Sequence, residues 1–167
     1  NGINRPDQMK STASSAMNAR EVDIYVFMNS GVYLYSPEKH ELQPVMEGDF
    51  RSKIMRSRPP RPTDKQTLGS KTDTPPPPRP PESNPPLQLI LIADSNRFPH
   101  GPENLRTEWC AIDTGIVSQN ISLFCAATGL KTRPKASMDK EKIKALLKLN
   151  EKQYVLLNHP VGYAKSL

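Results

Sequence analysis

The chain has 167 residues, enough for one domain or one subunit of an oligomer, and its 23 Lys and Arg against 17 Asp and Glu give a formal net charge of +6. Eleven of the 18 prolines and most of the excess positive charge lie in residues 51–86, which contain no aromatic side chain to stack on bases, so we predict no nucleic-acid partner. No apolar run approaches the roughly 20 residues of a membrane span, so we predict none.

The first predicted elements form a three-strand meander. Residues 21–28 (EVDIYVFM) are rich in β-branched and aromatic side chains, and after an Asn-Ser-Gly turn residues 32–35 resume the same pattern. A second turn, Pro-Glu-Lys-His, leads to a short strand at residues 42–45. The preceding residues 1–20 show neither helical nor strand periodicity, so we expect an ordered loop that leads into the first strand.

A proline-rich segment interrupts this pattern. From residue 52 to residue 86 nothing is periodic, and TPPPPRPPESNPP leaves few backbone donors, so we expect a polyproline II or disordered insertion packed against nothing. We therefore divide a single domain into residues 1–52, the insertion 53–86 and residues 87–167. Within the insertion, residues 56–62 match a basic PxxP ligand and predict a partner with an aromatic-lined groove.

The remaining predicted elements are strands and helices in mixed order. An apolar strand comes first, then two helical patterns, then a short last strand. With the meander, the order β-β-β, insertion, β-α-α-β predicts the α+β class. These elements are a strand at 87–94, a helix at 107–130 capped by Thr107 and ended by Gly129, a helix at 139–149 capped by Ser137, and a strand at 154–157.

Six small residues lie close to one line along the longer predicted helix, at about 100° per residue. Such a flat stripe lets another helix backbone or a planar ligand come close, although close packing inside a monomer would use it equally well. The stripe consists of Ala111, Gly115, Ser118, Ser122, Cys125 and Gly129.

No motif brings together side chains for metal or nucleophilic chemistry. The histidines His40, His100 and His159 stand in separate contexts without Cys or carboxylate at ligand spacing, so we expect surface or loop positions and no metal site. Cys110 and Cys125 are expected to be buried thiols. The sequence also lacks the nucleophile-elbow and Gly-rich phosphate-binding motifs, so we predict no catalytic side chain.

Four segments of the chain are informative as an ordered set. They are TASSAMN at 12–18 with EVDIYV at 21–26, GVYLY through EGD at 31–49, DTGIVSQN through ATGL at 113–130, and PVGY at 160–163. In this order they resemble the FMN-dependent nitroreductase family, in particular its branch related to the SagB-type dehydrogenases.

The resemblance implies a flavin site built from three places in the chain. One is a loop whose hydroxyl and carboxamide groups suit the polar edge of the isoalloxazine ring. The second is the stretch that borders the flavin near N5, and the third is a basic residue near the end that is a candidate phosphate contact. These positions are Ser14, Ser15 and Asn18 in the loop, Pro134, Lys135 and Ala136 near N5, and Lys165 at the phosphate.

The resemblance also implies an antiparallel sheet flanked by helices around a long central helix, in a homodimer with FMN at its interface. NAD(P)H would reduce the flavin, and a small-molecule acceptor such as a nitroaromatic or a quinone would take the electrons. The family's N-terminal helices have no counterpart in the sequence, so we expect a truncated member, with the cytoplasm as the favoured compartment. The alternative is a non-enzymatic remnant or interaction protein whose proline-rich arm recruits a partner.

Overall fold

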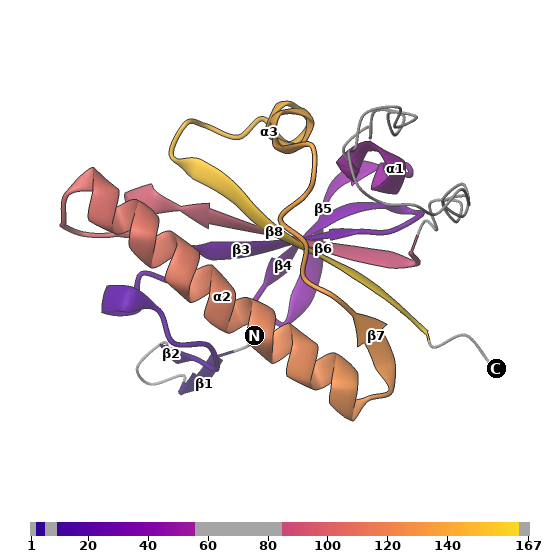
Figure 1. Cartoon of the computed structure of the whole chain (residues 1–167), viewed down its shortest axis with the longest axis horizontal. Helices are drawn as coiled ribbons and strands as arrows, with labels where there is room; N and C mark the ends of the chain where they lie inside the picture. Colours follow the sequence, from indigo (N-terminus) through magenta and orange to yellow (C-terminus); the bar gives the residue numbers. More distant parts are fainter. Residues whose placement is uncertain (1–2, 6–9, 56–84, 164–167) are drawn as a thin grey trace, which may run out of the picture.

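A computed structural model describes residues 3–5, 10–55 and 85–163 of the chain. Its centre is a six-stranded antiparallel sheet with the strand order β5-β4-β3-β6-β8-β7, crossed on one face by the long helix α2 (Figure 1). This arrangement confirms the predicted α+β class. The elements of this body are β3 (Val22–Phe27), β4 (Gly31–Ser36), β5 (Glu41–Glu47), α1 (Arg51–Ile54), β6 (Leu87–Asp94), α2 (Glu103–Ala127), β7 (Leu130–Thr132), α3 (Lys140–Leu147) and β8 (Gln153–Tyr163).

Each face of the sheet carries its own hydrophobic core. In β3, Ile24 and Val26 pack on the α2 side, whereas Phe27 packs with α1 and α3 on the other side. The central strand β6 contributes Leu91 to the first core and Ile92 to the second. A strand buried on both faces is apolar throughout, which is why the prediction of a strand at 87–94 is confirmed.

The N-terminal part contains more structure than the sequence predicts. The meander β3-β4-β5 is confirmed, but the expectation of a simple loop before it is wrong. Two very short strands, β1 (Ile3–Arg5) and β2 (Lys10–Ser11), pair with each other, and a single 3₁₀ turn, η2 (Ala16–Asn18), precedes β3. Elements of two or three residues are too short to leave a periodic pattern.

Helix α2 begins and ends earlier than the predicted range of 107–130. Its first residue is Glu103, because Pro102 occupies the N-cap position with φ −66°, and Thr107 instead donates to the Glu103 carbonyl within the first turns. The helix ends at Ala127, and Gly129 takes the left-handed conformation that favours glycine, with φ +75°. No helix in the described part of the chain is long and apolar enough to cross a membrane.

The C-terminal elements also differ from the sequence prediction at their ends. Asp139, not Ser137, caps α3, and its Oδ1 accepts the N–H of Lys142 at 3.2 Å. Strand β8 extends well beyond the predicted residues 154–157, and the unpredicted strand β7 pairs with its far end. Polar residues in the middle of β8 interrupt its apolar pattern, so the pattern predicts only the first part of the strand. The second part is defined by its pairing with neighbouring strands.

The two ends of the proline-rich insertion are tied together at its base. The Arg51 guanidinium donates to the carbonyls of Pro85 and Pro86 at 3.1 and 3.2 Å. Asp49 holds the same guanidinium through an ion pair of 2.6 Å. The chain therefore leaves and re-enters the folded body at neighbouring points.

Helix α1 belongs to the folded body. Ile54 is fully buried in the core beside α3, so the folded body includes residue 54. Residues 56–84, which include the PxxP motif at 56–62, lie outside the described residues.

Replacing residues 56–84 with a Gly-Ser linker of about six residues should leave the melting temperature within about 5 °C. The reason is that Arg51 already brings the two ends together, so a shorter loop closes at little entropic cost. Thermal unfolding followed by circular dichroism measures the effect.

The matched control is Ile54→Ala, which should cost about 2–5 kcal/mol and lower the melting temperature by roughly 5 to 20 °C. Loss of cooperative unfolding in the linker variant would contradict the prediction and show that the insertion stabilises the body.

Candidate functional site

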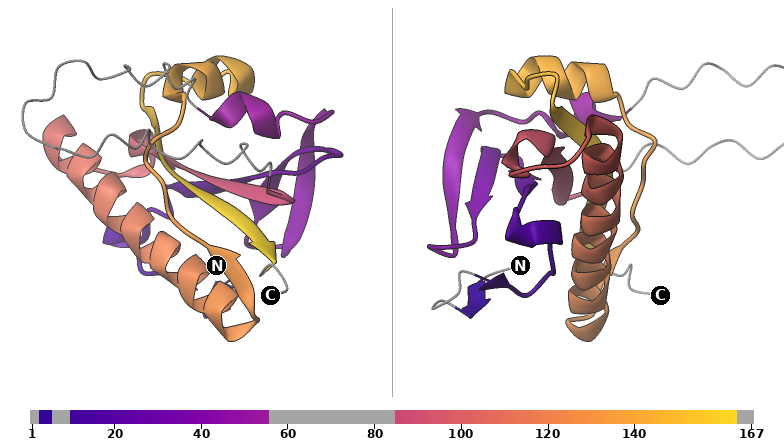
Figure 2. Two further views of the ribbon diagram at one scale, coloured as in Figure 1. Left: turned by 45° about the vertical axis from the view of Figure 1, so that its right-hand side comes forward. Right: turned by 90° about the vertical axis from the view of Figure 1, so that its left-hand side faces the viewer.

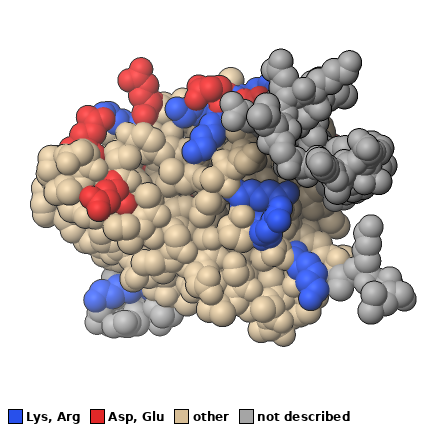
Figure 3. Space-filling model, viewed as in Figure 1, with Lys and Arg blue, Asp and Glu red and all other residues tan. Residues whose placement is uncertain are grey.

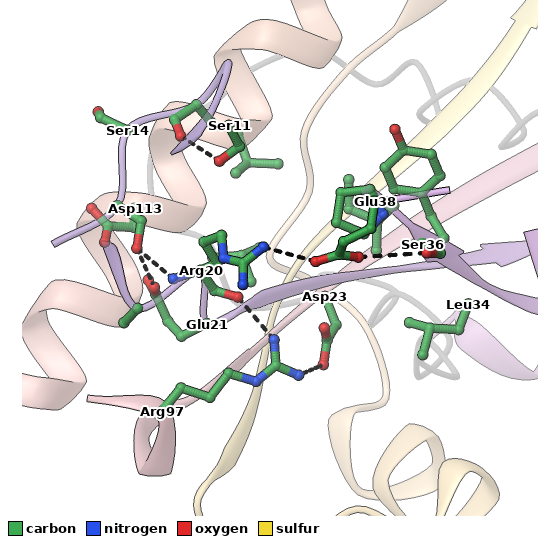
Figure 4. A pocket seen from close by; sticks show the side chains of 18 of the residues that line it. Ser11, Ser14, Arg20, Glu21, Asp23, Leu34, Ser36, Glu38, Arg97 and Asp113 are labelled. Carbon is green, nitrogen blue, oxygen red and sulfur yellow. Dashed lines mark hydrogen bonds and ion pairs between the residues drawn. The ribbon is translucent and has the colours of Figure 1, made fainter. Parts of the chain in front are cut away.

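A cavity of about 420 Å³ opens between the first half of β3 and the end of β4. The two strands pair from Tyr25 opposite Leu34 onward, so residues 22–24 diverge from β4 and leave space between the strands. The loop of residues 11–21 closes another side of this space (Figure 4). The cavity therefore lies beside the loop that the sequence predicts to contact a flavin ring.

Two ion pairs lie at the rim of this cavity. Arg20 Nη1 lies 2.7 Å from Glu38 Oε1, and Arg97 Nη2 lies 2.6 Å from Asp23 Oδ2. Burial raises the pKa of Asp23, and the charge of Arg97 offsets part of that shift. Both guanidinium groups are thus already paired with carboxylates at the rim.

Two carboxylates hold the loop between β2 and β3, one from Glu21 at the end of the loop and one from Asp113 on α2. The N–H of Ala16 donates to Asp113 Oδ2 on α2 at 2.7 Å. The Ser15 hydroxyl donates to Glu21 Oε2 at 2.8 Å, and its oxygen accepts the N–H of Arg20 at 2.8 Å (Figure 4). One carboxylate at the start of β3 and one on α2 therefore fix the shape of this loop.

The backbone of the loop is strained. Met17, Asn18 and Arg20 have φ of 52°, 54° and 48°, in the left-handed region. A residue other than glycine there costs about 1 kcal/mol or more. Such a conformation persists only where surrounding contacts hold it, and the hydrogen bonds to Glu21 and Asp113 are contacts of that kind.

Glu21 and Asp113 form a buried acidic pair. The exposed fraction is 0% for Glu21 and 5% for Asp113, and Glu21 Oε1 has no hydrogen-bond partner in the described part of the chain. Burial, reinforced by the neighbouring Asp113 carboxyl, raises the pKa of Glu21 to about 7. Burial and the same two carboxyls raise the pKa of Cys110 to about 12, so this thiol stays protonated and unreactive, in agreement with its predicted burial.

A group of cations lies on the other side of α2. Lys131, Arg133 and Lys135 alternate along the segment that follows the helix, and none of them forms an ion pair with another described residue. The backbone of Lys135 pairs with Asn158 of β8 through two hydrogen bonds of 2.8 Å. Figure 3 shows Lys and Arg side chains over the region of this segment. Three unpaired cations close together on a pinned segment suit an anionic group.

The structure places the predicted site residues in two separate groups. Ser14 and Ser15 line the cavity, and Asn18 is exposed on the same loop. The second group, residues 134–136, lies on the opposite side of α2 from this loop (Figure 2, right). A single copy of the chain therefore does not bring the two groups together. The remaining predicted residue, Lys165, lies outside the described residues.

Two polar residues of this site carry no sequence prediction. Glu21 reads as the first residue of a strand, and Asp113 reads as one residue of a helix pattern. The sequence contains one indication of a role for Asp113, which is the only charged residue between Glu108 and Lys131. A single carboxylate in so long an uncharged helix segment indicates a specific partner.

The expectation that His159 lies at the surface is wrong. This imidazole is fully buried between α2 and β7, where its Nε2 lies 2.8 Å from Ser118 Oγ and its Nδ1 lies 3.2 Å from Thr132 Oγ1. Burial lowers the pKa of His159. The predicted surface positions of the other two histidines are confirmed, since His40 and His100 are exposed.

The small-residue stripe of α2 divides between two environments. Ser118 and Cys125 are buried against the sheet, whereas Ala111 and Gly115 face outward. The outward part continues into exposed apolar side chains, among them Leu123 with 58% of its surface exposed. An exposed helix face that is apolar and without charge is typical of a protein interface.

The Nitroreductase family profile matches residues 7–163 of the chain. A putative nitroreductase from Ralstonia eutropha JMP134 has a similar structure, with 26% identity and a TM-score of 0.75 over 99% of this chain and 69% of its own. A chain of the E. coli microcin synthetase McbBCD complex with truncated pro-MccB17 bound has 14% identity and a TM-score of 0.73, over 99% of this chain and 60% of its own. A putative nitroreductase from Anabaena variabilis ATCC 29413 has 18% identity and a TM-score of 0.67, over 89% of this chain and 28% of its own.

No curated protein matches the chain. The chain spans between 28% and 69% of the length of these three structures, so the similarity concerns one part of each. The family profile, in contrast, extends over nearly all of this chain. The chain therefore belongs to the nitroreductase family, whose members are flavin-dependent oxidoreductases.

Proposed function

We propose that the chain is one subunit of an FMN-dependent oxidoreductase of the nitroreductase type. NAD(P)H would be the electron donor, and a small molecule such as a nitroaromatic or a quinone would be the acceptor. The single observation that supports this proposal most strongly is the pair of complementary polar groups on the two sides of α2. One group offers uncharged hydrogen-bonding atoms for a ring edge, and the other offers cations for an anionic group.

The donor set of the loop fits FMN. Asn18 is exposed, and its carboxamide makes no hydrogen bond with another described residue, so both its donor and its acceptor are available to the ring edge. Ser14 is exposed on the same loop. The Ser15 hydroxyl already donates a hydrogen bond to Glu21, so toward a ligand it can act only as an acceptor.

The donor set beyond α2 fits the charged parts of the same cofactor. Lys135 is half-buried and fixed through its backbone, and its ammonium has no carboxylate partner among the described residues. Pro134 and Ala136 are exposed on either side of it and leave the backbone accessible. FMN, when bound, supplies hydride acceptance and donation, and the protein supplies binding and orientation.

Because the two groups lie on opposite sides of α2, we propose that two copies of the chain build each site. The outward face of α2 would meet the same face of a second copy, as a twofold interface requires. The loop of one copy would then lie near residues 131–136 of its partner. The assignments of Lys165, of the SagB-like branch and of a truncated family member remain predictions from the sequence.

The first test is flavin binding by the purified chain. FMN added to it should bind and give absorbance near 450 nm that stays with the protein through gel filtration. Asn18→Ala and Lys135→Ala each remove one hydrogen-bond or charge partner worth about 1–3 kcal/mol, so each should weaken FMN affinity by roughly 5- to 150-fold. Fluorescence titration of FMN measures both.

Lys140→Ala serves as the matched control, since this exposed lysine at the start of α3 lies outside both groups. It should bind FMN like the unmodified chain. A folded protein that takes up no FMN would favour the alternative of a non-enzymatic interaction protein. Unchanged titrations for both Asn18→Ala and Lys135→Ala would remove these residues from the site.

The second test concerns the interface. A Cβ at Gly115 would meet no described atom within 4 Å in a single copy of the chain, so a side chain added there starts in open space. At a twofold interface the added side chain appears twice and overpacks the contact by about 1–3 kcal/mol per site. Gly115→Leu should therefore shift a dimer toward monomer at micromolar concentration, measured by sedimentation velocity.

The control for bulk alone is Ala145→Leu, at an exposed position of α3. This variant should sediment like the unmodified chain. If the unmodified chain is itself a folded monomer, the outward face of α2 does not form the interface and the two-subunit site is wrong.

A further inference from the structure

We propose that Glu21 and Asp113 are positioning residues for the loop of residues 14–20, and that they hold it by sharing one proton between their carboxyl groups. The inference rests on the proposed function, because the role of this loop at a flavin ring belongs to that proposal. It concerns how the ring-contact loop keeps its shape before any cofactor arrives.

Hydrogen bonds connect both carboxyl groups to the loop. Each carboxyl group takes one donor from the loop: Asp113 accepts the N–H of Ala16 at 2.7 Å, and Glu21 accepts the hydroxyl of Ser15 at 2.8 Å. The Ser15 oxygen in turn accepts the N–H of Arg20 at 2.8 Å, which fixes the far end of the loop. These three contacts bracket the left-handed residues Met17 and Asn18. The conformation that exposes the Asn18 carboxamide therefore depends on the carboxyl pair.

Other ionisable groups lie around the Glu21–Asp113 pair. The Asp113 carboxyl on α2 lies close enough to Glu21 to raise its pKa. Cys110, one turn earlier on α2, lies close to both carboxyls and to Asp94 of β6. The guanidinium groups that line the adjoining cavity, those of Arg20 and Arg97, are already paired with Glu38 and Asp23 at the rim. Neither Glu21 nor Asp113 forms an ion pair with a described cation.

One carboxyl oxygen of Glu21 lacks a hydrogen-bond partner among the described residues. Glu21 Oε1 is buried and accepts no hydrogen bond from any described residue. A proton on this oxygen turns it from an unsatisfied acceptor into a donor toward Asp113, and it reduces two buried negative charges to one. The elevated pKa of Glu21 agrees with this arrangement.

The proton links loop stability to pH, and the sign follows from the direction of the shift. Glu21 is protonated more readily in the closed loop than in an opened loop, where water restores an ordinary carboxyl. The closed loop is therefore fully stable below the ordinary pKa of 4.5 and loses stability as pH rises toward about 7. Above that range no further loss follows, because both states are then ionised.

The test is hydrogen exchange on the full chain without FMN, between pH 5 and 7.5. After correction for the intrinsic exchange rate, loop opening at Ala16 and Arg20 should rise by up to about tenfold per pH unit between pH 5 and 7. Glu21→Gln keeps the shape and the uncharged state at every pH, so its loop opening should be independent of pH. The sheet amides of Val26 and Leu91 report on global unfolding and separate it from local opening.

Two further variants complete the design. Glu108→Gln, on the outward face of the same helix, should keep the pH slope of the unmodified chain. Glu21→Leu removes the acceptor and should open the loop at all pH values; if it fails to fold, the isosteric Glu21→Gln still decides the question. The same loop exchange in the unmodified chain and in Glu21→Gln at every pH would overturn the proposal.

FMN titration at pH 5.5 and 7.5 separates this inference from the proposed function. The affinity of the unmodified chain should fall relative to that of Glu21→Gln as pH rises, and the titration of the FMN phosphate is common to both proteins and cancels. If loop exchange follows pH as expected but FMN binds at neither pH, the carboxyl pair holds the loop and the proposed function fails. If FMN binds and the two proteins keep the same ratio of affinities, the pair has no positioning role toward the flavin.

Discussion

The packing of α2 across the sheet determines where the described candidate site residues lie. The helix buries Val117 against Leu91 and the apolar side of β3, and His159 and Ser118 join it to β8 by a buried hydrogen bond. Asp113, on the same helix, then reaches the loop before β3. The helix thus fixes the loop on one of its sides, leaves the cations of residues 131–135 on the other, and presents an uncharged face outward. A change in this packing would move both halves of the proposed site at once.

The sequence predicts the elements whose signals are local. The meander of β3, β4 and β5 follows from alternation and from turn residues, and the buried strand β6 follows from a continuous apolar run. The end of α2 follows from Gly129. The predicted start at residue 107 lies too far along the chain because Thr107 is a good capping residue, whereas the helix starts directly after Pro102.

The polar contacts of the site could not be predicted in the same way. Burial of Glu21, Asp113 and His159 results from tertiary packing between α2, β8 and the loop, and no local pattern encodes it. The resemblance to a family placed Ser14, Ser15 and Asn18 on one loop, which the structure shows to be one, but it did not indicate that two carboxylates hold that loop. Strand β7 is not predicted from the sequence either, because only its pairing with β8 defines it.

In the proposed dimer, each flavin site takes its loop from one copy of the chain and its cations from the other. Mixing Asn18→Ala with Lys135→Ala tests it most directly. At an FMN concentration between the Kd of the unmodified chain and the roughly 5- to 150-fold higher Kd expected of each variant, each variant alone should hold much less FMN than the unmodified chain. After unfolding and refolding together in equal amounts, half of the dimers are mixed and each has one intact site, so about one quarter of the original FMN binding should return. No recovery in a mixture that has formed mixed dimers would contradict the account, because both groups would then have to act within a single copy.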